Sequence, residues 1–178
     1  GTYCIDSTVV TVNIQPMSTS ECCSIEPDFV LADPNCFGDA NGSLLITDIY
    51  ATDFSIDAGT TTQATGTFNG LTAANYNVQL SFGPDCVYDT TIVLNQPDEL
   101  TATFTIDSVS CNGLCDGEIQ ANTLGGTAPY NYSIGGTPAQ ASDTFSALCA
   151  GPATITITDD HNCQVVYPNT IFEPAVLT

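Results

Sequence analysis

Short segments rich in β-branched and aromatic residues recur along the whole chain, and many of them alternate apolar with polar positions. This alternation is typical of strands with one buried face, and the Asn-Gly and Gly-Gly pairs between the segments are typical of turns. No segment combines a helical period with capping residues. Many short strands separated by such turns predict an all-β chain built as a β-sandwich, with about six or seven strands per unit. The strands are predicted over Thr8–Ile14, Ser43–Ile49, Tyr76–Phe82, Asp89–Leu94, Leu100–Ile106, Ala153–Thr158 and Val165–Phe172.

The sequence repeats itself internally with a period of about 75 residues. A Cys-x-Gly-x-x-x-Gly motif at 36–42 recurs at 111–117, and the segment 68–73 recurs at 145–150. The pair Asp85-Cys86 matches Asn162-Cys163, and the same distance separates these pairs from Gln96-Pro97 and Glu173-Pro174. Three matching segments in the same order indicate a tandem duplication.

The two ends of the chain resemble parts of further repeats. Residues 3–16 match the end of a unit, and residues 173–178 match the opening of one. We therefore expect the chain to be a window from a longer array. The predicted organisation is the end of a preceding repeat over 1–17, a Cys-containing linker over 18–27, sandwich repeats over 28–98 and 99–174, and the start of a following unit over 175–178.

The charge balance excludes several classes of function. The chain of 178 residues has 20 acidic residues, one histidine and no Lys or Arg, which gives a formal net charge of -20. Nucleic-acid binding, phosphate cradles built on lysine, and attraction to anionic lipid all need cations that are absent. A hydrophobic content of 43% is sufficient for a folded core. Of the common enzyme chemistries only an acidic pair remains, and the sequence singles out none, so we expect no enzyme.

Nine cysteines are too many for ordinary cytosolic packing. No Cys-x-x-Cys pair occurs and the only histidine is His161, so disulfides in an oxidising compartment are favoured over metal clusters, with reduced buried cysteines as the alternative. The duplication predicts the equivalent bridges Cys36–Cys86 and Cys111–Cys163, each closing one sandwich. Cys115 and Cys149 occur only in the second repeat and are predicted to form a third bridge. Of Cys4, Cys22 and Cys23, Cys4 is expected to pair with one of the other two, which leaves one thiol free or intermolecular.

At this point the residues resemble a known family. The motif at 111–117, Gly-Gly-Thr-Ala-Pro-Tyr-Asn-Tyr-Ser at 125–133, Leu-Cys-Ala-Gly at 148–151 and Thr-Ile-Thr-Asp-Asp-His-Asn-Cys at 156–163 are similar to the SprB-type repeat of cell-surface adhesins in gliding Bacteroidota. The resemblance is close over 100–174 and looser over 27–97, where the Gly-Gly-x-x-Pro-Tyr segment is missing. It implies tandem immunoglobulin-like sandwiches, type IX secretion and a role in adhesion or filament building. The absence of Lys and Arg and the Glu21-Cys22-Cys23 insertion depart from the family pattern.

Other candidate sites carry weaker signals. His161 lies in an acidic turn, where a solvated loop residue is favoured over a metal ligand or catalyst. Asp159, Asp160 and Asn162 are a weak calcium candidate, because calcium prefers oxygen ligands but no known calcium-loop spacing is present. The N-glycosylation pattern occurs at Asn41 and Asn131 and is interpreted as chance in a bacterial protein. With the implied lineage, the Asp-(Ser/Thr) motifs make Ser7, Thr90 and Ser108 candidates for O-glycosylation, and hence the chain a candidate glycoprotein.

Two functions remain in competition. The first is a structural repeat segment of an extracellular, protease-resistant adhesin or filament, whose partners would be neighbouring repeats or identical subunits in a fibre. The second is a carbohydrate- or protein-binding module that meets surface glycans through an aromatic platform. Its candidate residues are Tyr50, Phe54, Tyr130 and Tyr132, although their alternation favours core or cross-strand positions. We expect no cofactor apart from the weak calcium candidate, no nucleic-acid partner and no direct membrane insertion.

Overall fold

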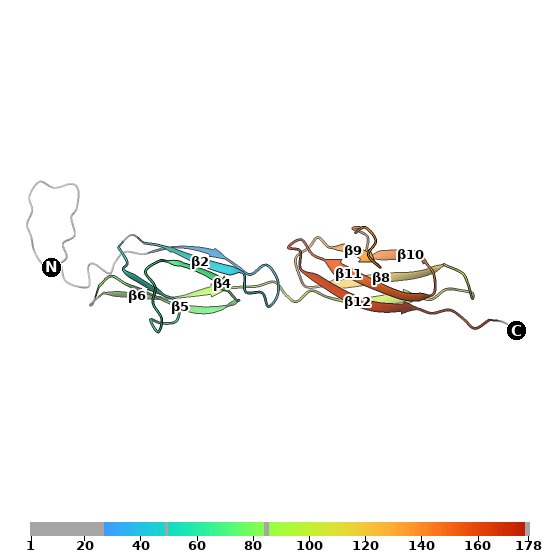
Figure 1. Cartoon of the computed structure of the whole chain (residues 1–178), viewed down its shortest axis with the longest axis horizontal. Helices are drawn as coiled ribbons and strands as arrows, with labels where there is room; N and C mark the ends of the chain where they lie inside the picture. The colour runs from blue at the N-terminus through green and yellow to red at the C-terminus, as the bar shows by residue number, and fades with distance from the viewer. Residues whose placement is uncertain (1–26, 49, 84–85, 177–178) are drawn as a thin grey trace, which may run out of the picture. The chain divides into compact units, whose positions relative to one another are not determined.

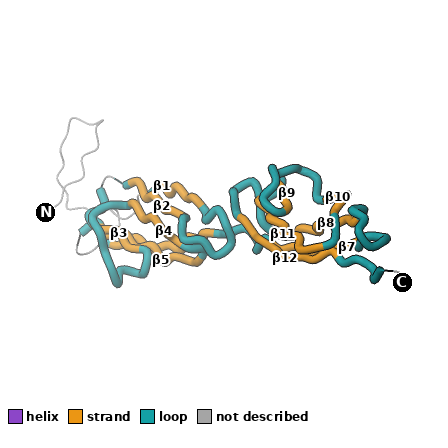
Figure 2. Tube along the Cα trace, turned by 45° about the vertical axis from the view of Figure 1, so that its right-hand side comes forward, coloured by secondary structure: helices purple, strands orange, loops and turns teal. Residues whose placement is uncertain are grey.

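The computed structural model describes residues 27–48, 50–83 and 86–176, which form two compact units (Figure 1). The first unit contains 27–34 and 40–95 of the described residues, and the second contains Asn35–Asp39 together with 96–176. All regular elements in these ranges are strands (Figure 2). Accordingly, no described segment is a helix of the length and apolarity that crossing a membrane requires. The predicted segments 1–17 and most of 18–27 lie outside the described residues.

The first unit is a sandwich of two three-stranded antiparallel sheets. One sheet has the order β1-β2-β4 and the other the order β3-β5-β6. The strands are β1 (Asp28–Ala32), β2 (Gly42–Thr47), β3 (Asp53–Ser55), β4 (Thr67–Leu71), β5 (Ala74–Ser81) and β6 (Val87–Leu94).

The second unit repeats this topology strand for strand. Its sheets have the orders β7-β8-β10 and β9-β11-β12, again antiparallel throughout. The strands are β7 (Thr101–Asp107), β8 (Gly117–Leu124), β9 (Asn131–Ile134), β10 (Thr144–Leu148), β11 (Gly151–Thr158) and β12 (Gln164–Ile171). The shared topology shows that the internal repeat of the sequence is a repeat of the fold.

The strand pairing is that of an immunoglobulin-like sandwich. The two sheets of each unit correspond to strands A-B-E and C-F-G of that fold, without strand D. In the first unit Tyr76 lies near the start of β5, and its hydroxyl donates to the carbonyl of Thr72 at 2.8 Å. This is the tyrosine corner found at the same place in many immunoglobulin domains. The predicted fold class, an all-β chain of β-sandwich repeats, is confirmed.

Each sandwich has its own hydrophobic core, which follows the alternation of its strands. In β5 Val78 and Leu80 are buried, and in β11 Ile155 and Ile157 are completely buried. Their neighbours in sequence point to the other face of the sheet, because successive side chains of a strand alternate. The first core also contains Leu44, Ile46, Phe54, Leu71 and Leu94, and the second also contains Leu100, Val109, Ile119, Ala121, Tyr132, Phe145, Ala153 and Ile171.

The predicted strands after residue 40 correspond to β2, β5, β6, β7, β11 and β12. The other strands after residue 40, which are shorter or more polar, were not predicted: β3, β4, β8, β9 and β10. The clearest example is β4, whose Asn69-Gly70 pair is typical of a turn. In the structure Gly42 pairs with Leu71 and Ser43 pairs with Asn69, so Gly70 is the extra residue of a β-bulge. Its φ of +71° is a conformation that glycine adopts without strain.

A matching pair of glutamines shows how closely the two folds agree in detail. The amide of Gln63 donates to the carbonyls of Thr65 and Thr67, at 2.6 and 2.9 Å. The amide of Gln140 donates to the carbonyls of Ser142 and Thr144, at 3.0 and 2.9 Å. Each glutamine thereby orders the segment that leads into β4 or β10, and the pattern analysis of the sequence did not identify either residue.

Candidate functional site

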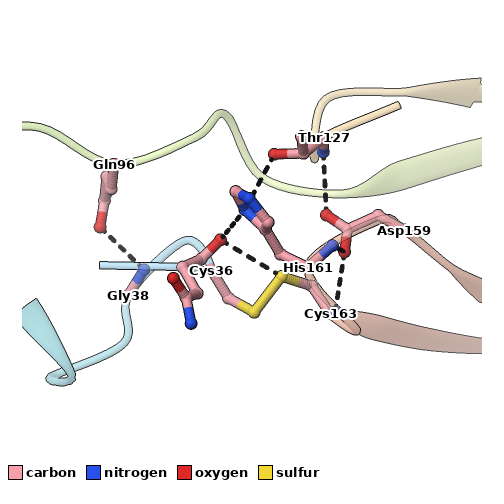
Figure 3. The surroundings of a disulfide bond; sticks show 8 residues. Cys36, Gly38, Gln96, Thr127, Asp159, His161 and Cys163 are labelled. Carbon is pink, nitrogen blue, oxygen red and sulfur yellow. Dashed lines mark hydrogen bonds between the residues drawn. A yellow bond between two sulfur atoms is a disulfide. The ribbon is translucent and has the colours of Figure 1, made fainter. Parts of the chain in front are cut away.

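A short segment after β1 belongs to the second compact unit. Residues Asn35–Asp39 follow β1 in the chain, yet they are part of the unit that contains 96–176. The amide N–H of Gly38 donates to the side-chain oxygen of Gln96 at 2.9 Å (Figure 3). The internal repeat of the sequence assigns these residues to the first repeat, 28–98. Repeat boundaries mark only equivalent positions in the sequence, so they do not show which hydrophobic core a loop packs against.

The centre of this region is a disulfide between Cys36 and Cys163, whose Cα atoms are 5.7 Å apart (Figure 3). Cys36 lies between β1 and β2, and Cys163 lies between β11 and β12, 127 positions later in the chain. The predicted bridges Cys36–Cys86 and Cys111–Cys163 are therefore wrong. The physical reason is that disulfides join cysteines whose Cα atoms lie about 4.4–6.8 Å apart, and the location of Asn35–Asp39 in the second unit brings Cys36 to Cys163.

Asp159 organises the turn that presents Cys163. It is 2% exposed, and its carboxylate accepts the backbone N–H groups of Thr127, His161 and Cys163 at 2.8, 2.9 and 2.8 Å (Figure 3). The backbone of the turn adds hydrogen bonds from Asp159 N to Cys163 O and from Asn162 N to Asp159 O, at 3.0 and 3.1 Å. The three N–H donors stabilise the buried carboxylate. The same hydrogen bonds fix the backbone of the turn, and so the position of Cys163.

His161 contacts the segment that carries Cys36. Its ring nitrogen Nδ1 lies 3.1 Å from the carbonyl oxygen of Asn35 and 3.3 Å from the hydroxyl of Thr127 (Figure 3). Because a carbonyl oxygen only accepts, Nδ1 carries the hydrogen in the contact with Asn35. The side chain is exposed, as the sequence predicted for a loop residue, but it also helps to hold residues 35–39 against the turn.

The remaining described cysteines have three different states. Cys115 and Cys149 form the bridge that the sequence predicts, between the loop before β8 and the segment after β10. Cys86 is disulfide-bonded, and its partner is none of the other described cysteines. Cys111 is free and exposed, contrary to its predicted pairing. Cys4, Cys22 and Cys23 lie outside the described residues.

A pocket of about 350 Å³ opens beside the bridge, within the second unit. Its polar lining consists of three carboxylates and two side-chain amides, and the sulfurs of Cys36 and Cys163 are already joined to each other. This lining contains no nucleophile next to a histidine base, which is one arrangement used in covalent catalysis. The lining residues are Cys36, Phe37, Asp39, Pro97, Asp98, Glu99, Leu100, Gly126, Asn162, Cys163, Gln164 and Val165.

The weak calcium candidate gains no support from the geometry. Both oxygens of Asp159 face backbone N–H donors, whereas Asp160 and Asn162 are exposed. Within 27–48, 50–83 and 86–176, no group of three or more His, Cys, Asp or Glu side chains is arranged to hold a metal ion. Asp159 therefore has a structural explanation that does not need calcium.

The glycosylation candidates differ in accessibility. Ser108 is exposed directly after β7, Thr90 is half-buried in the middle of β6, and Ser7 lies outside the described residues. The aromatic candidates do not gather on a surface. Phe54 and Tyr132 are core residues at 4% and 6% exposure, and the half-buried Tyr130 donates its hydroxyl hydrogen to Gly125 O at 2.7 Å. Of the four residues suggested as a platform, only Tyr50 is exposed.

Comparison with known proteins supports the resemblance found in the sequence. No curated protein matches the chain. Residues 103–137, which run from within β7 to just beyond β9, match the family model of the SprB repeat. This family and the disulfide bonds are consistent with an extracellular or cell-surface protein. The match supports the resemblance of the second repeat to the SprB-type repeat.

Proposed function

We propose that the chain is a structural repeat segment of an extracellular, protease-resistant adhesin or filament on the bacterial surface, and that it is not an enzyme. The observation that carries the proposal is the Cys36–Cys163 bridge, which joins residues from two successive sequence repeats. Disulfides of this kind persist in oxidising compartments. A bridge that ties one repeat to the next serves a protein whose task is to remain connected.

The position of the bridge suits a chain that is pulled along its length. Tension that enters at the N-terminal side and leaves at the C-terminal side passes directly from Cys36 to Cys163 through the sulfurs. The covalent path then bypasses residues 37–162, which include every strand from β2 to β11. The bypassed strands carry no covalent load, so the bridge protects them when an attached cell is subjected to drag.

The amino-acid composition supports protease resistance by a separate route. Trypsin-like proteases recognise Lys or Arg through an acidic pocket, and this chain contains neither residue. Acidic solubility needs only an excess of Asp and Glu, so it does not account for the complete loss of cations. Resistance to trypsin should persist even when the fold and the disulfides are removed.

Immunogold labelling of intact source cells tests the proposed location and role. An antibody raised against the chain should label the cell surface, and gentle shearing should release labelled fibres that electron microscopy resolves. Label confined to the cell interior would contradict the proposal. If the released chain bound defined sugars on a glycan array, the result would favour the carbohydrate-binding module instead.

Digestion of the reduced and denatured protein tests the protease argument. Trypsin should leave the chain intact, whereas chymotrypsin should cut it rapidly at its 7 tyrosines and 8 phenylalanines. The native protein with its disulfides provides the matched control for protection by the fold. Efficient cleavage of the denatured chain by trypsin would refute protection by composition.

A further inference from the structure

Cys111 lies in a loop with the same local conformation as the loop of Cys36. The amide N–H of Asp39 donates to Cys36 O at 3.2 Å, and the amide N–H of Leu114 donates to Cys111 O at 3.1 Å. The glycine two residues after each cysteine has a left-handed φ, +77° at position 38 and +80° at position 113. The two cysteines therefore begin the same kind of turn.

The two loops are also held by equivalent side chains. Gly38 N donates to Gln96 Oε1 at 2.9 Å, and Gly113 N donates to Glu173 Oε2 at 3.1 Å. Gln96 and Glu173 each precede a proline and follow the last strand of a sandwich. Cys111 thus occupies in the second repeat the position that Cys36 occupies in the first.

Only one of these equivalent cysteines has a partner in the structure. Cys36 is bonded to Cys163, which directly precedes the last strand of the next repeat, whereas Cys111 is free and exposed. Cys86, which directly precedes β6 as Cys163 precedes β12, is also disulfide-bonded, and its partner is not a described cysteine of its own repeat. The bridge of Cys36 is the observation that identifies the kind of partner that fits Cys111.

The surface around Cys111 has the character of an uncovered contact. Leu114 and Phe172 are 47% and 67% exposed. Phe172 lies beside the start of the loop, because its carbonyl accepts the amide N–H of Val109 at 3.1 Å. The loop itself is ordered by Ser110, whose amide N–H donates to the Asp116 carboxylate at 2.9 Å. Cys111, Leu114 and Phe172 are therefore all accessible to a partner on this side of the loop.

We propose that Cys111 forms a disulfide with the cysteine that precedes the last strand of a following sandwich repeat in the same chain. Of the proposed function, this proposal requires only that sandwich repeats follow one another along the chain. The two thiols lose two protons and two electrons, a sulfur–sulfur bond forms, and a protein or glutathione disulfide is reduced to two thiols. Each such junction of the array then carries a disulfide, as the junction between repeats 28–98 and 99–174 does through Cys36 and Cys163.

The test is disulfide mapping of an extended chain. A second copy of residues 98–178, which carries Cys111→Ser, is joined after Pro174, because Glu173-Pro174 stands where Gln96-Pro97 begins the second repeat. This substitution leaves the natural Cys111 as the one source of Cys111 peptides. The natural chain and the extended chain are refolded with oxidised and reduced glutathione, alkylated with N-ethylmaleimide without reduction, and digested with chymotrypsin and Glu-C. Cys111 should be alkylated in the natural chain. In the extended chain its alkylation should fall at least tenfold, and a peptide that joins Cys111 to the added copy of Cys163 should appear.

The extended chain with Cys163→Ser in the added copy alone is the matched control, and alkylation of Cys111 should return there. The amount of the Cys115–Cys149 peptide per chain should double, which reports that the added repeat has folded. Continued alkylation of Cys111 in a folded extended chain, or a Cys111–Cys111 dimer of the natural chain, would overturn the proposal. A second measurement maps the protein from source cells alkylated before extraction, where a free Cys111 would also overturn it. These results do not depend on whether immunogold places the chain at the cell surface.

Discussion

Replacing the buried Asp159 should destabilise the second sandwich more than replacing Asp160, its exposed neighbour in the same turn. The substitution Asp159→Ala removes the acceptor for three backbone N–H groups, those of Thr127, His161 and Cys163. A hydrogen bond to a charged group contributes about 1.5–3 kcal/mol. These donors are only partly buried, so water replaces part of the loss. We expect the free energy of unfolding of this unit to fall by about 3–5 kcal/mol.

Two further variants make this expectation specific. The Asp159→Asn side chain keeps one oxygen for the N–H groups of His161 and Cys163, but its amide is a donor that faces Thr127 N–H. The expected loss is about 1.5–3 kcal/mol, the contribution of one charge-assisted hydrogen bond. Asp160→Asn makes the same chemical change at the exposed neighbour and should alter stability by no more than about 0.5 kcal/mol.

Urea unfolding with the disulfides intact, followed by far-ultraviolet circular dichroism, measures the three variants. Because the chain has two units, hydrogen exchange of peptides from β11 and β12 assigns the affected transition to the second sandwich. The reasoning predicts a graded series, with Asp159→Ala most destabilised and Asp160→Asn least. Equal effects of Asp159→Ala and Asp160→Asn would show that the three hydrogen bonds do not hold the turn.

Three more predictions concern the bridge, an exposed carboxylate and the net charge. Force spectroscopy of the oxidised chain should not release the residues between Cys36 and Cys163, which are 127 positions apart. A reductant, which also opens the enclosed Cys115–Cys149 bridge, should add about 430 Å of extension; release without reduction would contradict the bridge. Hydrogen bonds from the Thr61 hydroxyl, the Thr61 amide and the Ser55 hydroxyl lower the pKa of Asp57 from 3.8 to about 2. The ionised Asp57 side chain therefore contributes fully to the free energy of unfolding above pH 3.8, and this contribution is lost as the pH falls towards about 2. Asp57→Asn should flatten the pH dependence of the free energy of unfolding in that window, with Asp53→Asn as the control. The chain has a net charge of -20 and no Lys or Arg, so its carboxylates repel one another. Raising salt from 10 to 150 mM should raise the melting temperature, because the screening length shortens from about 30 to about 8 Å. An unchanged melting temperature would show that carboxylate repulsion does not reduce the stability.

The absence of cations in the sequence has a visible structural consequence. Without Lys or Arg, carboxylates that need a partner accept hydrogen bonds from the backbone and from hydroxyl groups. Asp48 accepts the amide N–H groups of Tyr50 and Ala51, Asp33 accepts that of Asn95, and Asp116 accepts both the amide and the hydroxyl hydrogen of Ser110. The donors to Asp33, Asp48 and Asp116 were identified only by the structure.

The sequence by itself determined the fold class, the duplication and the regular strands. Alternation in segments such as 153–158 predicts which residues are buried, because side-chain direction in a strand has a strict period of two. Local patterns failed where a bulge and polar residues occur in a strand, as at Asn69-Gly70 in β4. There the cross-strand partner decides the conformation, and the partner is distant in sequence.

The partner of Cys36 was decided only by the tertiary structure. The repeat made Cys36 and Cys111 equivalent, and Cys86 and Cys163 equivalent, but equivalence does not say which loop meets which turn. That choice depends on residues 35–39 joining the second unit, where Asp159 and His161 order the turn around Cys163. A disulfide forms between sulfurs that the fold brings together, so its pairing follows from long-range packing that a periodic pattern does not encode.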